Sequence, residues 1–105
     1  MTEVGRSALV VRPAQPFLDW LQSVDPTSMD LTLADLSIEP TIYLIPECEV
    51  PEDVVECLRD VFDEIFQNQL DGWYRVRETW PTNRSYEMFC RWFDYSFHSV
   101  LLDLG

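Results

Sequence analysis

PEDVVECLRDVFDEIFQNQLDGW, residues 51–73, decides the fold because it specifies the longest regular element of the chain. Its apolar residues recur at steps of three and four over about five turns, which is the spacing of one face of an α-helix. Pro51 suits the first turn, and Glu52 and Asp53 suit the positive end of the helix dipole. The stretch predicts one long amphipathic helix whose apolar stripe is Val54, Val55, Leu58, Val61, Phe62, Ile65, Phe66, Leu70 and Trp73.

The opposite face of this predicted helix is acidic. Nine carboxylates occur in residues 47–71 against the single Arg59, a local charge of -8. Carboxylates three, four and seven residues apart on a helix stand roughly 5–10 Å from one another, as phosphates do in nucleic acid. Such a face suits a basic partner and could imitate a nucleic acid, although a solvated face that keeps a small protein soluble has the same pattern. The candidate binding residues are Asp53, Glu56, Asp60, Asp63 and Glu64.

The rest of the chain supplies the strands and shorter helices of a small α+β domain. β-Prone runs predict strands near residues 7–11, 41–45 and 95–104, and helical spacing predicts further helices at residues 16–24 and 83–93. Their order implies a two-layer fold, in which about three helices pack on one face of a small three-stranded sheet. All 105 residues then belong to a single domain with one core.

Two of these elements carry more detailed expectations. Residues 41–45, TIYLI, are apolar at nearly every position and lie between two prolines, which favours a middle strand buried on both faces. Thr82 is the expected N-cap of the last helix, whose expected apolar stripe consists of Tyr86, Phe89, Cys90 and Phe93. Trp92 falls off that stripe, so we expect its ring to be partly exposed.

Composition and charge limit the partners of the protein. The net charge is -12, the pI is about 4.1 and all seven basic residues are arginine. A chain this acidic repels phosphate backbones, so direct binding to nucleic acid or to an anionic membrane is disfavoured. The three cysteines form no CxxC pair, and the chain shows neither a signal-peptide pattern nor a membrane-spanning run. We therefore predict a cytoplasmic protein.

A family resemblance is carried by YLIPE at residues 43–47 and by WPTNRSYEMFCRWFDYSFHSVLLDL at residues 80–104. Through these segments the chain resembles an uncharacterised family of small acidic bacterial proteins of about this length. The WPxNRxYxxFxxWF pattern is fairly specific, and the resemblance covers roughly the C-terminal two thirds of the chain. It implies a free-standing cytosolic protein of bacterial type, and it brings neither an activity nor residue roles.

A second candidate site combines arginines with aromatic residues. Residues 73–91 carry four arginines against two glutamates, which makes this the one locally basic segment. Arginine beside exposed aromatic rings suits an anionic or planar ligand. Alternatively, the rings fill the core and the arginines neutralise the acidic helix beside them. The residues of this alternative pocket are Trp80, Arg84, Tyr86, Trp92 and His98.

Catalytic and metal sites find little support in the sequence. His98 is the only histidine and would share a strand face with Ser96, but nucleophilic catalysis also needs a third group that orients the ring. Cys48, Cys57, Cys90 and His98 lack the paired spacings of a zinc site. We therefore expect a structural His98, and we predict no catalytic residue, no metal and no cofactor.

These observations favour a non-enzymatic protein-interaction module that presents an acidic helix face to a basic partner. The competing hypothesis is a small-molecule or enzymatic pocket around Arg84, Trp80, Tyr86 and His98, which requires polar groups that converge on a concave site. A third hypothesis is self-association through Trp80, Trp92 and an open strand edge. The protein is then either a monomer or a homodimer.

Overall fold

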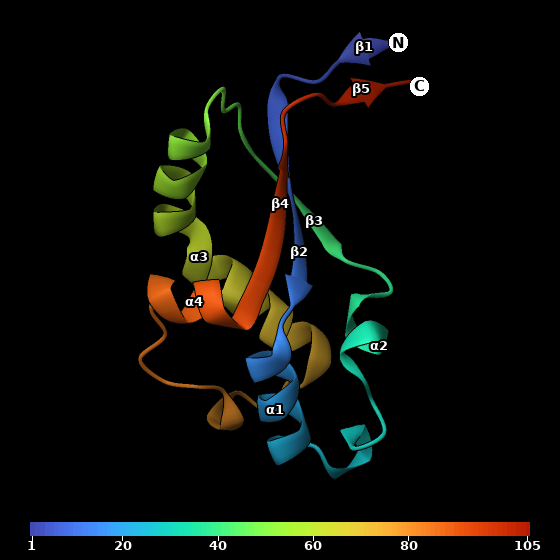
Figure 1. The fold of residues 1–105 in the computed structure, drawn as a ribbon, viewed down its shortest axis with the longest axis vertical. Coiled ribbons are helices and arrows are strands. Elements are labelled where there is room, and N and C mark those ends of the chain that lie inside the picture. Colours follow the sequence, from blue (N-terminus) through green and yellow to red (C-terminus); the bar gives the residue numbers. More distant parts are fainter.

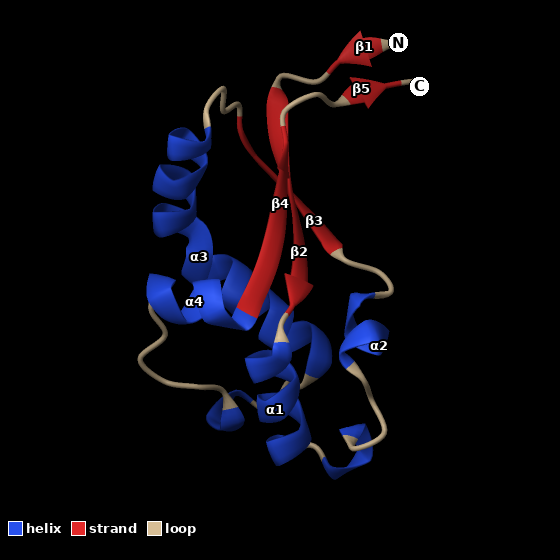
Figure 2. Ribbon diagram, viewed as in Figure 1, coloured by secondary structure: helices blue, strands red, loops and turns tan.

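The longest element of the structure is α3, Pro51–Trp73, whose bounds are those predicted from its apolar spacing. The computed structural model describes residues 1–105, and Figure 1 shows its ribbon. α3 lies beside a three-stranded antiparallel sheet with the order β3-β2-β4 (Figure 2). These strands span Thr41–Pro46, Arg6–Pro13 and Phe93–His98 respectively. The α+β class and the small three-stranded sheet predicted from the sequence are confirmed.

Three shorter helices accompany α3. α1 spans Gln15–Val24, α2 spans Leu33–Ser37 and α4 spans Tyr86–Trp92. Short 3-10 turns at Pro26–Ser28 and Arg77–Thr79 lie in the connections after α1 and α3. In Figure 1, α4 lies beside α3, α1 follows the end of β2, and α2 lies next to the start of β3.

The middle strand of the sheet is β2, so the prediction that residues 41–45 form the middle strand was wrong. β2 pairs with both β3 and β4, whereas β3 pairs with β2 alone. Ile45 of β3 is buried, but Ile42 and Leu44 are 62% and 55% exposed. Successive side chains of a strand point to opposite faces, so an edge strand with one covered face can still be apolar throughout. A continuous apolar run therefore does not distinguish a middle strand from an edge strand.

The stretch predicted as one strand over residues 95–104 is divided in the structure. β4 ends at His98, and the chain then forms β5, Leu102–Asp103, which pairs with β1, Thr2–Glu3. The backbone N–H of Val4 donates to the carbonyl of Leu101 at 2.8 Å beside this pair. Figure 1 shows the resulting two-stranded ribbon, with both termini, extending beyond the main sheet.

The hydrophobic core lies where the sheet meets the helices. β2 contributes Leu9 and Val11, which are fully buried. The helices α1, α3 and α4 contribute further fully buried side chains, namely Phe17, Leu21, Leu58, Phe66, Leu70 and Phe89. The Phe66 ring of α3 is central, with its centroid 5.4 Å from Trp92, 5.1 Å from Phe93 and 6.4 Å from Phe89. This aromatic cluster joins α3 to α4 and to the start of β4.

The N-terminus of α4 differs from the predicted one. The side-chain oxygen of Ser85, not of Thr82, accepts the hydrogen bond that caps the helix, from the backbone N–H of Met88 at 3.1 Å. Asn83 has a φ of 56°, a left-handed conformation that asparagine tolerates better than most residues. This residue turns the chain before the cap, so the helix begins later than predicted.

The apolar stripe of α4 is also rotated from the predicted one. Cys90, an expected core position, is exposed, whereas Trp92 packs against the core. α4 ends at Trp92 and Phe93 already belongs to β4. The stripe therefore consists of Tyr86, Phe89 and Trp92, and Phe93 reaches the core from the strand instead.

Candidate functional site

The outward face of α3 carries a group of four carboxylates, the acidic row, which consists of Asp53, Glu56, Asp60 and Glu64. All four residues are exposed, and none of them takes part in an ion pair or a side-chain hydrogen bond. Their spacing places them on one face of the helix, opposite the side that buries Leu58. The acidic row therefore faces solvent, and none of its carboxylates forms an ion pair within the protein.

Asp63, the fifth carboxylate predicted for this face, is engaged within the fold. Arg84 donates from Nε to Asp63 Oδ1 at 2.7 Å and from Nη2 to Oδ2 at 3.4 Å, and Gln67 donates to Oδ2 at 2.6 Å. Asp63 and Arg84 form the only ion pair of the structure. The hydrogen bonds from Arg84 hold the pKa of the Asp63 carboxyl below its ordinary value. Asp63 thus ties α3 to the segment that precedes α4.

Trp80 and Arg84, two residues of the alternative pocket, hold the chain between α3 and α4. Trp80 is only 8% exposed, and its indole N–H donates to the carbonyl of Tyr74 at 2.8 Å. The guanidinium of Arg77 lies over the Trp80 ring at 5.6 Å. Arg84 also donates from Nη1 to the carbonyl of Pro81 at 3.0 Å. Both side chains are therefore already occupied by contacts within the protein.

Tyr86 and Trp92, two further residues of the alternative pocket, pack on α3. The Tyr86 ring lies 6.1 Å from Phe62 and 4.5 Å from the guanidinium carbon of Arg59, which makes a cation–π contact. Burial raises the pKa of Tyr86 to about 12. Trp92 is half-buried, with its ring centroid 5.4 Å from that of Phe66. One side of the Tyr86 ring is therefore covered by Arg59, and the Trp92 ring packs on Phe66.

His98, the last residue of the alternative pocket, lies apart from the others at the end of β4. The ring is exposed, and its Nε2 atom lies 3.0 Å from the hydroxyl of Ser96. No carboxylate hydrogen-bonds to the ring, so no third group orients it. Trp80 and Arg84 both lie in the connection before α4, but the structure does not gather the five predicted residues around one cavity.

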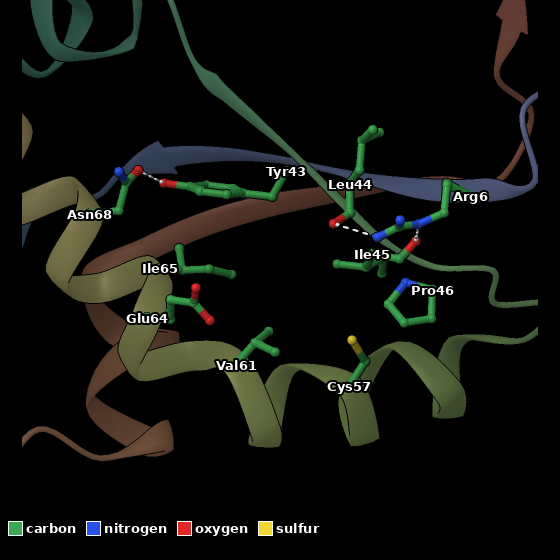
Figure 3. Close-up of a pocket in the computed structure, with 10 residues that line it drawn as sticks. All are labelled: Arg6, Tyr43, Leu44, Ile45, Pro46, Cys57, Val61, Glu64, Ile65 and Asn68. Carbon is green, nitrogen blue, oxygen red and sulfur yellow. Dashed lines mark hydrogen bonds between the residues drawn. The ribbon is translucent and has the colours of Figure 1, made fainter.

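The cavity of the protein lies elsewhere, between β3 and α3 (Figure 3). Its volume is about 410 Å³, and ten residues line it, of which six are hydrophobic. The strand side includes Ile45 and Pro46, and the helix side includes Val61 and Ile65. None of the five residues of the alternative pocket lines this cavity.

A polar network joins the strand to the helix at one end of the cavity. The hydroxyl of Tyr43 donates to Asn68 Oδ1 at 2.5 Å, and the amide of Gln69 donates to Tyr43 Oη at 2.8 Å and to Thr41 Oγ1 at 2.9 Å. Gln69 is only 6% exposed, and no buried side-chain polar atom of the structure lacks a partner. Burial raises the pKa of Tyr43, so its phenol keeps the proton that it donates.

The remaining polar groups of the cavity differ in whether they have partners within the protein. At the far end, Arg6 donates from Nε to the carbonyl of Ile45 at 3.0 Å and from Nη2 to that of Leu44 at 3.4 Å (Figure 3). Glu64 of the acidic row also lines the cavity, and its carboxylate has no partner. Burial raises the pKa of the Cys57 thiol, which is therefore protonated at neutral pH. The cavity offers apolar walls and one free carboxylate, but no activated thiolate.

The structure also bears on metal and membrane binding. No three histidine, cysteine, aspartate or glutamate side chains lie close enough together to hold a metal ion. None of the helices has the combination of length and apolar character that crossing a bilayer requires.

Sequence reasoning missed the cavity, although two signals in the sequence point to it. Gln69 occupies a position on the apolar side of α3, where a polar residue needs a buried partner. Thr41 and Tyr43 alternate along β3, so their hydroxyls share one face of the strand. Read together, these residues indicate a polar contact between strand and helix, and the cavity lies beside that contact.

Comparisons of the chain with protein-family models, with curated proteins and with solved structures give no match.

Proposed function

We propose that this protein is a non-enzymatic protein-interaction module and that the acidic row of α3 is the surface that it presents to a basic partner. The observation that carries this proposal is the exposure of four carboxylates on one helix face, none of which forms an ion pair. The only ion pair of the structure joins Arg84 to Asp63, so no arginine forms an ion pair with the row. The protein therefore keeps a concentrated negative charge available to a partner.

Electrostatic complementarity explains how such a surface would act. A negative row speeds the encounter with a positive surface and disfavours acidic competitors. Because the carboxylate spacing resembles that of phosphates along nucleic acid, a protein whose site accommodates a phosphate backbone is one class of partner. The interaction weakens with salt, since the screening length falls from about 10 Å at 0.1 M to about 3 Å at 1 M. A reducing, cytoplasmic location fits the proposal, because all three cysteines are free.

The competing hypotheses receive less support from the same contacts. Trp80 and Arg84 bind backbone carbonyls of their own segment, and His98 lies in another part of the protein. A small-molecule or catalytic site at these residues lacks the convergence of polar groups that such sites need. The self-association hypothesis loses its two tryptophans, because both rings pack against the protein's own side chains, and it retains only the open edges of the sheet at β3 and β4.

Neutralising the acidic row should weaken the binding of a basic peptide and remove most of its salt dependence. The variant carries Asp53→Asn, Glu56→Gln, Asp60→Asn and Glu64→Gln, and the probe is a short fluorescent peptide of arginine and lysine. If each exposed charge contributes between about 0.2 and 1 kcal/mol, the four together weaken binding by between about fourfold and several hundredfold. Fluorescence anisotropy at about 0.1 M and about 1 M salt measures the change.

A matched control separates the position of the charges from their number. It neutralises four exposed carboxylates away from α3, namely Glu3, Asp30, Glu39 and Asp94, none of which accepts a side-chain hydrogen bond. We expect this control to bind the peptide almost as tightly as the unaltered protein does. Equal losses in the two variants would show that net charge alone drives binding, and the proposed role of the acidic row would be wrong.

A further inference from the structure

We propose that the cavity between β3 and α3 receives an apolar side chain of the basic partner, which is held beside basic residues that contact the acidic row. The inference rests on the function proposed above and specifies the partner further. The partner segment is one in which a large apolar residue is flanked by arginine or lysine. An apolar residue without basic neighbours, or a basic segment without an apolar residue, would use only half of the surface.

The chemistry of the cavity supports an apolar occupant. Its walls include Ile45 and Pro46 from the strand and Val61 and Ile65 from the helix (Figure 3). The volume of about 410 Å³ lies near the lower end of the range of small-molecule pockets, roughly 300–1,000 Å³. That space suits one large aliphatic or aromatic side chain together with the backbone on either side of it. Buried apolar anchors of this kind supply much of the binding energy of protein interfaces.

Glu64 connects the cavity to the acidic row. This residue belongs to the row and also lines the cavity, and Figure 3 shows its carboxylate directed toward the space between strand and helix. Asp60 lies one helical turn away on the same face, because residues four apart on a helix are neighbours. A cationic side chain next to the anchor can therefore reach Glu64 while a second one reaches Asp60.

Charge also argues against other occupants of the cavity. A free anion is repelled by the net charge of -12, and the one cation that lines the cavity, Arg6, is engaged with the carbonyls of Leu44 and Ile45. A second copy of this chain would bring its own negative charge to the acidic row. A basic segment with an apolar residue matches both the apolar walls of the cavity and the carboxylates of the acidic row beside it.

A peptide series tests the inference on the unaltered protein. Three peptides share the same arginine and lysine flanks and differ only at the central residue, which is alanine, leucine or phenylalanine. A fourth has a leucine centre and glutamine flanks. Because burying a leucine or phenylalanine side chain stabilises by about 1.5–3 kcal/mol, the leucine and phenylalanine peptides should bind about tenfold or more tighter than the alanine peptide. The glutamine-flanked peptide should bind weakly.

A cavity-filling substitution locates the anchor. Val61→Phe places a ring in the cavity and should remove the preference for leucine or phenylalanine while leaving the alanine peptide bound. Val100→Phe is the matched control, because Val100 is 70% exposed and does not line the cavity. If Val61→Phe does not fold, Cys57→Leu serves as the second cavity-filling variant, because Cys57 lines the cavity one helical turn earlier.

The outcomes separate this inference from the proposed function. If binding needs the acidic row but is equal for all three central residues, the anchor inference is overturned and the proposed function stands. If no basic peptide binds at low salt, the proposed function fails and the anchor inference fails with it. If light scattering shows that the unaltered protein self-associates and that Val61→Phe abolishes this, a second copy occupies the cavity and the inference is likewise overturned.

Discussion

Replacing Phe66 with alanine is expected to lower the free energy of unfolding by about 3–5 kcal/mol. The Phe66 ring is fully buried and packs against Phe89, Trp92 and Phe93. Its removal leaves a cavity at the junction of α3, α4 and β4, and the aromatic cluster cannot close it without moving two helices. Since small domains are stable by about 5–15 kcal/mol in total, this loss is a large part of the whole. Urea denaturation followed by circular dichroism measures it.

Ile42→Ala is the control for this prediction. Ile42 is 62% exposed on the outer face of the edge strand β3, so its truncation should change stability by no more than about 0.5 kcal/mol. If residues 41–45 instead formed a middle strand covered on both faces, Ile42→Ala would cost several times more. Comparable losses for Phe66→Ala and Ile42→Ala would contradict the sheet order described above.

Trp80→Ala is expected to destabilise the protein by a similar amount, about 3–5 kcal/mol. The indole is buried where the chain crosses from α3 to α4, and its N–H satisfies the carbonyl of Tyr74. Trp80→Phe should cost less, about 1–3 kcal/mol, because it keeps most of the apolar surface but leaves that carbonyl without its partner. The same denaturation experiment measures both losses.

This pair of substitutions also addresses the alternative pocket. Trp73→Ala is the comparison, because Trp73 at the end of α3 is far more exposed than Trp80 and should contribute clearly less to stability. If Trp80 belonged to a ligand pocket, Trp80→Ala would leave stability nearly unchanged. A stable Trp80→Ala protein would therefore reopen the hypothesis of a site around Trp80 and Arg84.

Elements with a strong local pattern were predictable from the sequence. The steps of three and four from Val54 to Trp73 predicted the extent of α3. Nine apolar positions on one stripe also determine which side of the helix faces the core. The same pattern predicted the outward direction of Asp53, Glu56 and Asp60. These predictions depend on the geometry of a single helix and not on how elements meet.

Features that depend on tertiary packing were not predictable in the same way. Whether TIYLI is a middle or an edge strand depends on which strands pair with it, and the exposure of Ile42 follows from that pairing. Trp92 packs against the core in place of the predicted Cys90, and this difference depends on where α4 ends. Engagement of Asp63 by Arg84 needs the two residues to meet across the fold, and their separation of 21 positions gives no local signal.

Amide NMR spectra of isotope-labelled protein, titrated with the arginine and lysine peptide, test the role of the acidic row most directly. We predict that the resonances that shift belong to the outward face of α3 around Asp53, Glu56, Asp60 and Glu64, and that about 1 M salt reverses the shifts. Resonances of β1, β5 and the outer face of β4 should remain unchanged. Shifts that cluster on β4 around His98, or that survive high salt, would contradict the proposal.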